Sequence, residues 1–218
     1  RGARLDQLTL PKLDVSPLNF ASLHLPVLTD VPELSSRAKL ELGEKLLMIR
    51  DRFGLASGAL HPDLASAETA AWLKELGIPF GIENMDRTKK SHRSVEEVAD
   101  TLVQWKVPLV LDLQHAYENS KDAGGDGIDL SMDLVRVARN AYGITHLHVS
   151  GEIASKSGAQ LDNHASLIWA TNTKTILAAI KAVVRSIDAP VRIILEGNYL
   201  PGDRPGELLR VEDSGSTE

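Results

Sequence analysis

Residues 107–115 read VPLVLDLQH, an apolar run of strand length that ends in an acid and an imidazole, Asp112 and His115. Five further runs share this design: LNFASLH (18–24), ASGALH (56–61), IPFGIE (78–83), ITHLH (144–148) and VRIILE (191–196). Near-continuous apolar runs are typical of parallel strands buried on both faces. Because a barrel gathers the carboxyl ends of its strands around one axis, the polar residues that end these runs are expected at one rim.

Amphipathic segments separate these runs. Apolar residues recur there three and four positions apart, which predicts one buried face on each of three helices. These faces consist of Leu42, Leu46, Ile49 and Phe53, then Leu130, Leu134, Val137 and Ala141, then Ile176, Ile180 and Val183. Ser94 and Glu97 have the spacing of a capping box, so a further helix is expected to begin after Ser94.

The alternation of strand and helix to the end of the chain predicts the α/β class and a (β/α)8 TIM barrel. Only six strands are evident, so one or two N-terminal strands could be lacking, although residues 5–10 (LDQLTL) could supply one. We expect residues 1–211 to form a single TIM-barrel domain and residues 212–218 to form a disordered tail.

Composition narrows the class of protein. The 218 residues include no cysteine, which excludes disulfides and thiolate ligands. The net charge of −6 argues against non-specific attraction to a polyanion. No run reaches the roughly 18 apolar residues of a membrane span, so no membrane partner is expected and a cytoplasmic location is the default.

Nine histidines and carboxylates near the strand ends are candidate metal ligands: His24, His61, Glu83, Asp112, His115, His148, Asp162, His164 and Glu196. Imidazole and carboxylate together suit zinc, manganese or iron better than calcium, which prefers oxygen ligands alone. Nine donors exceed what one ion can use. The set therefore predicts two or three ions, or one ion together with acid and base groups.

Other residues near these positions are candidates for substrate contact. Arg87 and Lys89 follow the Glu83 strand in a basic loop, which either binds phosphate at the rim or is solvated. Asn84 and Tyr117 follow ligand positions and either touch substrate or bond the rim, and Asn198 is expected on the same side of its strand as Glu196. His146 shares a strand face with His148, as a partner of that residue or as a core residue, and His92 is expected in a surface loop.

The chain resembles the xylose isomerase-like TIM barrels and, within them, the endonuclease IV type of apurinic/apyrimidinic endonuclease. The residues that carry the resemblance are SLHLP (22–26), LHPD (60–63), IENMD (82–86), LDLQHAY (111–117), HLHVSG (146–151), LDNHASL (161–167) and IILEGN (193–198). The resemblance implies a metal-dependent phosphoester hydrolase with up to three zinc ions, with manganese, magnesium, cobalt or iron as alternatives. Its substrate would be a sugar phosphate or an abasic site in damaged DNA.

The resemblance also implies roles for single residues. His24, His61 and Glu83 would hold a first ion. Glu83, Asp112, His148 and Glu196 would hold a second ion. His115, Asp162 and His164 would hold a third. Glu83 would bridge two ions, and Glu83 and Glu196 are the predicted catalytic residues.

Some features of endonuclease IV are missing, which keeps other functions open. Val149 to Glu152 stand where that family has Asn-Asp-Ser-Lys, and Val27 stands where it has an aromatic DNA wedge. One alternative is a sugar or sugar-phosphate isomerase or epimerase, with one ion held by Glu83, Asp112, His148 and Glu196. Others are a multinuclear iron oxidative enzyme, and a non-catalytic barrel that binds metal or sugar or takes its missing strand from a partner chain.

Overall fold

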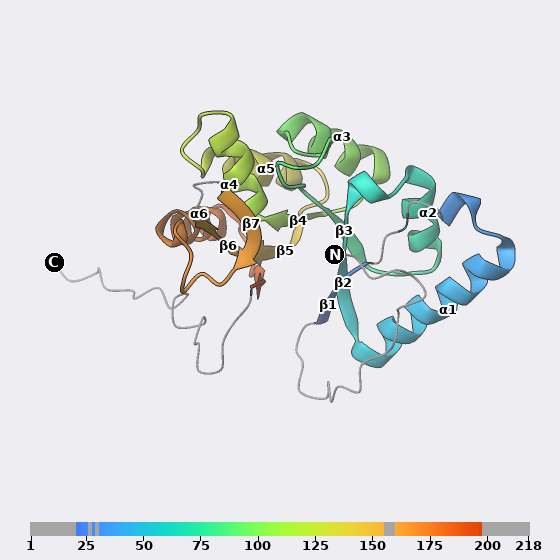
Figure 1. Ribbon diagram of the computed structural model, residues 1–218. Coiled ribbons are helices and arrows are strands. Elements are labelled where there is room, and N and C mark those ends of the chain that lie inside the picture. Colours follow the sequence, from blue (N-terminus) through green and yellow to red (C-terminus); the bar gives the residue numbers. More distant parts are fainter. Residues whose placement is uncertain (1–20, 26–27, 29–30, 155–159, 198–218) are drawn as a thin grey trace.

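The computed structural model describes residues 21–25, 28, 31–154 and 160–197 (Figure 1). Its central element is a curled sheet of six parallel strands in the order β1-β2-β3-β4-β5-β8. The strands are β1 (Ala21–His24), β2 (Leu55–Leu60), β3 (Phe80–Glu83), β4 (Leu109–Asp112), β5 (Ile144–Val149) and β8 (Arg192–Leu195). All six strands predicted from the apolar runs are confirmed.

Within the described residues, six helices accompany the sheet: α1 (Ser36–Phe53), α2 (Ala67–Glu75), α3 (Val95–Trp105), α4 (Leu113–Asp122), α5 (Asp129–Asn140) and α6 (Thr173–Ser186). Two short 3₁₀ turns lie at Val31–Glu33 and Pro62–Leu64. The helices lie around the outside of the curl, and their buried apolar residues form one core with those of the strands (Figure 1). The architecture is an α/β half-barrel.

Local signals explain where several helices begin. Ser94 accepts a hydrogen bond from the Glu97 backbone, and the Glu97 side chain accepts one from the Ser94 backbone, which confirms the capping box of α3. Asp112 ends β4 and at once caps α4 by accepting from the backbone N–H of His115 at 2.8 Å. This side-chain cap replaces a connecting loop, which brings His115 close to the strand end.

The predicted buried face of α5 needs a correction. The residues it buries are Ser131, Leu134, Val135 and Ala138. Val137 is only half-buried, and Ala141 lies beyond the helix. The spacing correctly indicated a helix, but Leu134 and Val135 are adjacent apolar residues, so the sequence period alone left the face ambiguous by one position.

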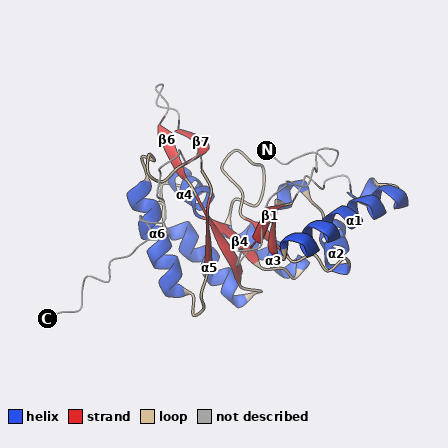
Figure 2. Cartoon of the chain, turned by 90° about the horizontal axis from the view of Figure 1, so that it is seen from below, coloured by secondary structure: helices blue, strands red, loops and turns tan. Residues whose placement is uncertain are grey.

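The strict alternation of strand and helix also fails at two places. Two helices, α4 and α5, follow β4 in succession. Between β5 and α6 the chain forms an antiparallel pair, β6 (Gly151–Ala154) with β7 (Gln160–Ala165), separate from the main sheet. Figure 2 shows the pair projecting from one end of the sheet. Gly151 is required there because a Cβ at this position would lie 2.3 Å from the Cβ of Ala170. The hairpin carries Asp162 and His164.

The sheet curls far enough for strands that are not neighbours to touch. The hydroxyl of Ser22, in β1, lies 3.1 Å from Nε2 of His146, in β5, although three strands separate the two in the sheet. Neighbouring strands also pack closely: a Cβ at Gly81, in β3, would approach the carbonyl oxygen of Pro108, just before β4, to 2.8 Å. The curl thus brings side chains of β1 and β5 into contact across the interior.

The remaining predictions about the fold are settled only in part. Residues 5–10 and the tail 212–218 lie outside the described residues, and closure into a (β/α)8 barrel stays a prediction. Among the residues that the structure describes, no helix is both long enough and apolar enough to span a membrane.

Candidate metal centre

The predicted ligands gather at the carboxyl ends of the parallel strands. His24, Glu83 and Asp112 are the last residues of β1, β3 and β4, while His61 and Glu196 directly follow β2 and β8. His148 is the penultimate residue of β5. His115 and His164 reach the same region from α4 and β7. The parallel topology therefore brings eight of the nine residues to one rim; the side chain of the ninth, Asp162, lies outside the described residues.

Glu83 lies at the centre of this cluster and is fully buried. Its Oε1 is 2.8 Å from Nδ1 of His148, and its Oε2 is 3.0 Å from Nε2 of His61 and 3.8 Å from Nδ1 of His24. Burial raises the pKa of this carboxyl, but the hydrogen bond from His148 and the nearby imidazoles outweigh burial and hold the pKa well below its usual range. Glu83 is therefore ionised among three imidazoles.

Glu196, which follows the edge strand β8, makes a second set of contacts. Its Oε1 lies 2.7 Å from Nε2 of His24 and 3.2 Å from Nδ1 of His148, and its Oε2 lies 3.6 Å from Nδ1 of His164. Burial raises the pKa of Glu196, but the hydrogen bond from His24 and the nearby imidazoles outweigh burial, so the pKa lies below its usual value. The two glutamates thus share His24 and His148.

The two shared imidazoles respond to these acids. Burial lowers the pKa of His148, but the hydrogen bond to Glu83 and the surrounding carboxylates outweigh it and raise the pKa above 6.5. Burial also lowers the pKa of His24, but the hydrogen bond to Glu196 and the nearby carboxylates outweigh it, so the pKa of His24 is raised as well. An imidazole that holds a proton between carboxylates neutralises the same negative charge that a bound cation would neutralise.

Three overlapping groups of these residues have the geometry to hold metal ions. The groups are His24, Glu83, His148 and Glu196; Glu83, Asp112 and His115; and Asp112, His164 and Glu196. Within each group one donor atom per residue lies within 4.8 Å of every other. Each of the three carboxylates belongs to two groups, so the groups form one connected cluster.

One buried carboxylate oxygen gives an independent test of whether a cation fits. Asp112 is fully buried, and its Oδ2 has no hydrogen-bond partner among the described residues. Burial raises the pKa of Asp112, which means that its charge is poorly compensated by the protein alone. A buried charge without compensation is costly, and a metal ion within reach of Oδ2 would remove that cost. The donor set therefore fits a divalent cation.

The grouping differs from the one that the resemblance to endonuclease IV implies. His148 lies with His24, and His115 lies with Glu83 and Asp112. His61 belongs to none of the three groups, although its Nε2 is close to Glu83.

The predicted substrate contacts are largely engaged with the protein. The side-chain amide of Asn84 donates to the carbonyl of Asp112 at 2.9 Å and accepts from its N–H at 2.8 Å, so Asn84 fixes the end of β4. The Tyr117 hydroxyl donates to Glu152 Oε1 at 3.2 Å. Asn198 lies outside the described residues.

The basic loop after β3 is also paired. Arg87 lies 3.9 Å from Glu118 and 3.7 Å from Asp122, and Lys89 lies 3.4 Å from Asp63. His92, predicted in a surface loop, is half-buried and its Nε2 lies 3.0 Å from the Thr101 hydroxyl. The loop is therefore held in place by side-chain contacts.

Sequence reasoning gave too little weight to buried polar residues beside the cluster. His146, expected either as a core residue or as a partner of His148, is both: it is fully buried, and its Nε2 lies 3.1 Å from Nε2 of His148. The spacing of two from a ligand was the signal for this contact. Gln114 links Glu118 to Asn172 through bonds of 3.0 and 2.7 Å, a network for which the sequence holds no comparable signal.

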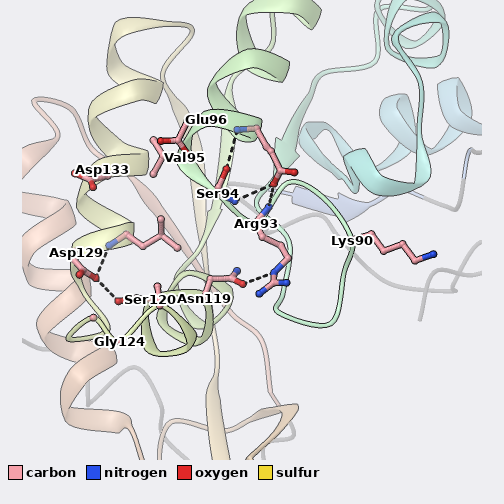
Figure 3. A pocket seen from close by; sticks show the side chains of 14 residues that line it. Lys90, Arg93, Ser94, Val95, Glu96, Asn119, Ser120, Gly124, Asp129 and Asp133 are labelled. Atoms are coloured by element: carbon pink, nitrogen blue, oxygen red, sulfur yellow. Dashed lines mark hydrogen bonds between the residues drawn. The ribbon is translucent and has the colours of Figure 1, made fainter.

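A separate polar pocket lies between the first turns of α3 and α5 and the end of α4 (Figure 3). Its polar groups bond one another: Arg93 donates to Asn119 at 2.9 Å, and Ser120 donates to Asp129. None of the nine predicted ligands lines this pocket. The pocket is therefore separate from the cluster of predicted ligands at the strand ends.

Comparison with models of known protein families and with curated proteins finds no match for this chain.

Proposed function

We propose that this protein is a metal-dependent phosphoester hydrolase of the endonuclease IV kind, built on a xylose isomerase-like (β/α)8 barrel. The observation that carries the proposal is the sharing of Glu83, Asp112 and Glu196 among three donor groups. A single ion would leave most of these donors without a task, and idle buried polar groups are costly. Connected groups with shared carboxylates suit several neighbouring cations.

Different donor groups would hold different ions. His24, His148, Glu83 and Glu196 would hold one ion, and Glu83 with Asp112 and His115 would hold a neighbour. When bound, divalent ions polarise a phosphoryl oxygen and lower the pKa of water, and zinc is the first choice for this donor set.

The two catalytic glutamates would differ in role. Glu83 is fully buried and stays ionised, and it belongs to two donor groups, so it would be shared by two ions. Glu196 is partly exposed and accepts the proton of the attacking water as the new P–O bond forms. The leaving oxygen departs with its electron pair as the old P–O bond breaks, and it takes a proton from solvent.

The proposed substrate is a small sugar phosphate or the phosphodiester at an abasic site. Arg87 and Lys89 stand on the loop that follows the Glu83 strand, so they would meet a phosphate at the rim by exchanging their present carboxylate partners for it. A net charge of −6 favours a substrate with few phosphates over a long polyanion.

A sugar isomerase or epimerase is the second candidate, and one observation favours it. Both glutamates contact His148 in a single donor group, so one ion there would lie between two carboxylates. Such a pair could exchange a proton at the carbon beside a sugar carbonyl. The ion pairs of Arg87 and Lys89 also suit an uncharged sugar.

Metal counting and a substrate panel separate the candidates. Purified protein would be loaded with zinc, and bound ions counted by native mass spectrometry and X-ray absorption. It would then be assayed on abasic-site oligonucleotides, sugar phosphates and ketoses. Two or three ions with phosphoester cleavage support the hydrolase. One ion with ketose turnover supports the isomerase. An absence of bound ions overturns both enzymes, and ion binding without turnover of any substrate favours a non-catalytic barrel.

A further inference from the structure

His146 contacts three different groups through its two ring nitrogens. Its Nε2 lies 3.1 Å from Nε2 of His148 and 3.1 Å from the Ser22 hydroxyl, while its Nδ1 lies 2.9 Å from the Thr145 hydroxyl. The residue is fully buried. Burial favours the neutral form of an imidazole, which carries one proton, on one nitrogen only.

The Thr145 hydroxyl indicates which nitrogen carries that proton. Its Oγ1 lies 3.4 Å from the carbonyl oxygen of Leu109, a group that can only accept. A hydroxyl that donates to this carbonyl must accept from Nδ1 of His146. The His146 proton then sits on Nδ1, and its Nε2 is left as an acceptor.

The neighbouring imidazole supplies the donor. His148 directs Nδ1 toward Glu83 and Glu196, at 2.8 and 3.2 Å, and Nε2 toward His146. If Nε2 of His146 accepts, Nε2 of His148 carries a proton. The Ser22 hydroxyl, in β1, points at the same acceptor and contacts it from across the interior.

We propose that His146 is a positioning residue: it accepts the Nε2 proton of His148 and thereby keeps Nδ1 of His148 as the nitrogen that binds metal. This inference deepens the proposed function and rests on the metal site assigned there. A hydrogen bond of this kind holds a ligating imidazole in one tautomer and one ring orientation. The opposite tautomer would direct an N–H at the two glutamates and a lone pair away from them.

Two variants of similar length separate an acceptor role from a packing role. His146→Gln keeps an acceptor oxygen near the position of Nε2, whereas His146→Met fills similar space without a strong acceptor. We expect the methionine variant to bind zinc roughly 10- to 100-fold more weakly than the parent protein, as measured by competition with a chelator. The glutamine variant should recover most of that loss. Circular dichroism would establish that both variants are folded.

Nitrogen NMR reads the tautomer without reference to activity. In ¹⁵N-histidine-labelled protein, we expect Nε2 of His148 to be protonated, with a scalar coupling across the hydrogen bond to Nε2 of His146, and this signal should persist after zinc is added. The coupling should disappear in His146→Met.

Failure of this inference and failure of the proposed function would look different. An unprotonated Nε2 on His148 in the parent protein, or a methionine variant that binds zinc as tightly as the parent, would overturn the role of His146 and leave the hydrolase intact. A parent protein that retains the N–H···N coupling and binds zinc, but cleaves no phosphoester, would support the role of His146 and overturn the hydrolase.

Discussion

Nε2 of His24 lies 2.7 Å from Oε1 of Glu196, although the two residues stand at opposite edges of the described sheet and 172 positions apart. His24 ends β1 and Glu196 follows β8. The strands themselves are not paired, so side chains bridge the gap at the rim. Because His24 and Glu196 share a donor group, a bound cation would link the first and last strands of the described sheet.

Zinc should therefore stabilise the fold. A ligand that binds only the native state at 100 times its dissociation constant adds about 2.7 kcal/mol, so a clear rise in Tm is expected. Scanning calorimetry with zinc, with calcium, and with a chelator would measure it. Calcium should have little effect because imidazoles are poor ligands for it. An unchanged Tm in zinc would contradict the site.

The Glu83→Gln variant should lose metal and turnover together. The substitution removes the charge that faces His148, His61 and His24 and leaves an amide in a fully buried position. Bound zinc per chain, counted by mass spectrometry, should fall by at least one ion. Glu41→Gln on α1, where the side chain is exposed, is the matched control and should keep full occupancy. Full occupancy in Glu83→Gln would rule out the bridging role.

Stability of the metal-free protein should decline above about pH 6.5. The pKa values of His24 and His148 are higher in the folded state than the 6.5 of the unfolded chain. Protonation of these two residues therefore adds its full amount to the free energy of unfolding below pH 6.5, and this amount is lost as pH rises through the folded-state pKa values. His146 has the opposite effect on stability. Its pKa is about 4 in the folded state, so below pH 6.5 the unfolded chain binds a proton before the folded chain does, and the free energy of unfolding falls as pH is lowered.

Bound zinc should reverse the decline in stability above pH 6.5. Metal ions compete with protons for His24 and His148, so affinity should increase as pH rises through their pKa values. Urea unfolding from pH 5 to 9, with and without zinc, would measure both slopes. Parallel profiles in the two conditions would show that these imidazoles do not bind the ion.

Replacing both Arg87 and Lys89 with glutamine should weaken binding of phosphorylated substrates. Loss of a hydrogen bond to a charged group costs about 1.5 to 3 kcal/mol, so KM should rise at least tenfold. Arg37→Gln on the exposed face of α1 is the control. An unchanged KM would identify the loop as ordinary surface held by its own ion pairs.

Gly127→Ala should destabilise the protein more than Gly124→Ala. Both glycines have positive φ, +95° and +81°, so alanine is strained at either position. A Cβ at Gly127 would lie 2.5 Å from the Tyr117 ring, whereas one at Gly124 meets nothing within 4 Å. Overpacking adds about 1 to 3 kcal/mol, which urea unfolding of the two variants would resolve. Equal losses would show that Tyr117 moves freely.

The rim could be predicted because its signals are local. Each apolar run states where a strand ends, and the residue that follows is read directly from the sequence, as with Glu83 after IPFGI and Glu196 after VRIIL. Parallel topology then places all strand ends on the same side, whatever the details of packing. The same reasoning placed His146 on the face of His148.

The β6–β7 hairpin and the pairing of donors could not be read in this way. Gly151 begins a strand of an antiparallel pair because Ala170 and Asn172 approach its backbone, and both come from a segment about 20 residues later. The grouping of His148 with His24 likewise depends on contacts between β1 and β5, which are not neighbouring strands in the sheet.

The amino-acid sequence alone determined the six parallel strands, the four helices α1, α3, α5 and α6 and the residues delivered to the rim, since hydrophobic period and helix caps act within a few residues. Only the tertiary structure decided which of those residues meet. Curl accumulates from the twist of every strand, so the contacts of Ser22 with His146 and of His24 with Glu196 are properties of the whole sheet.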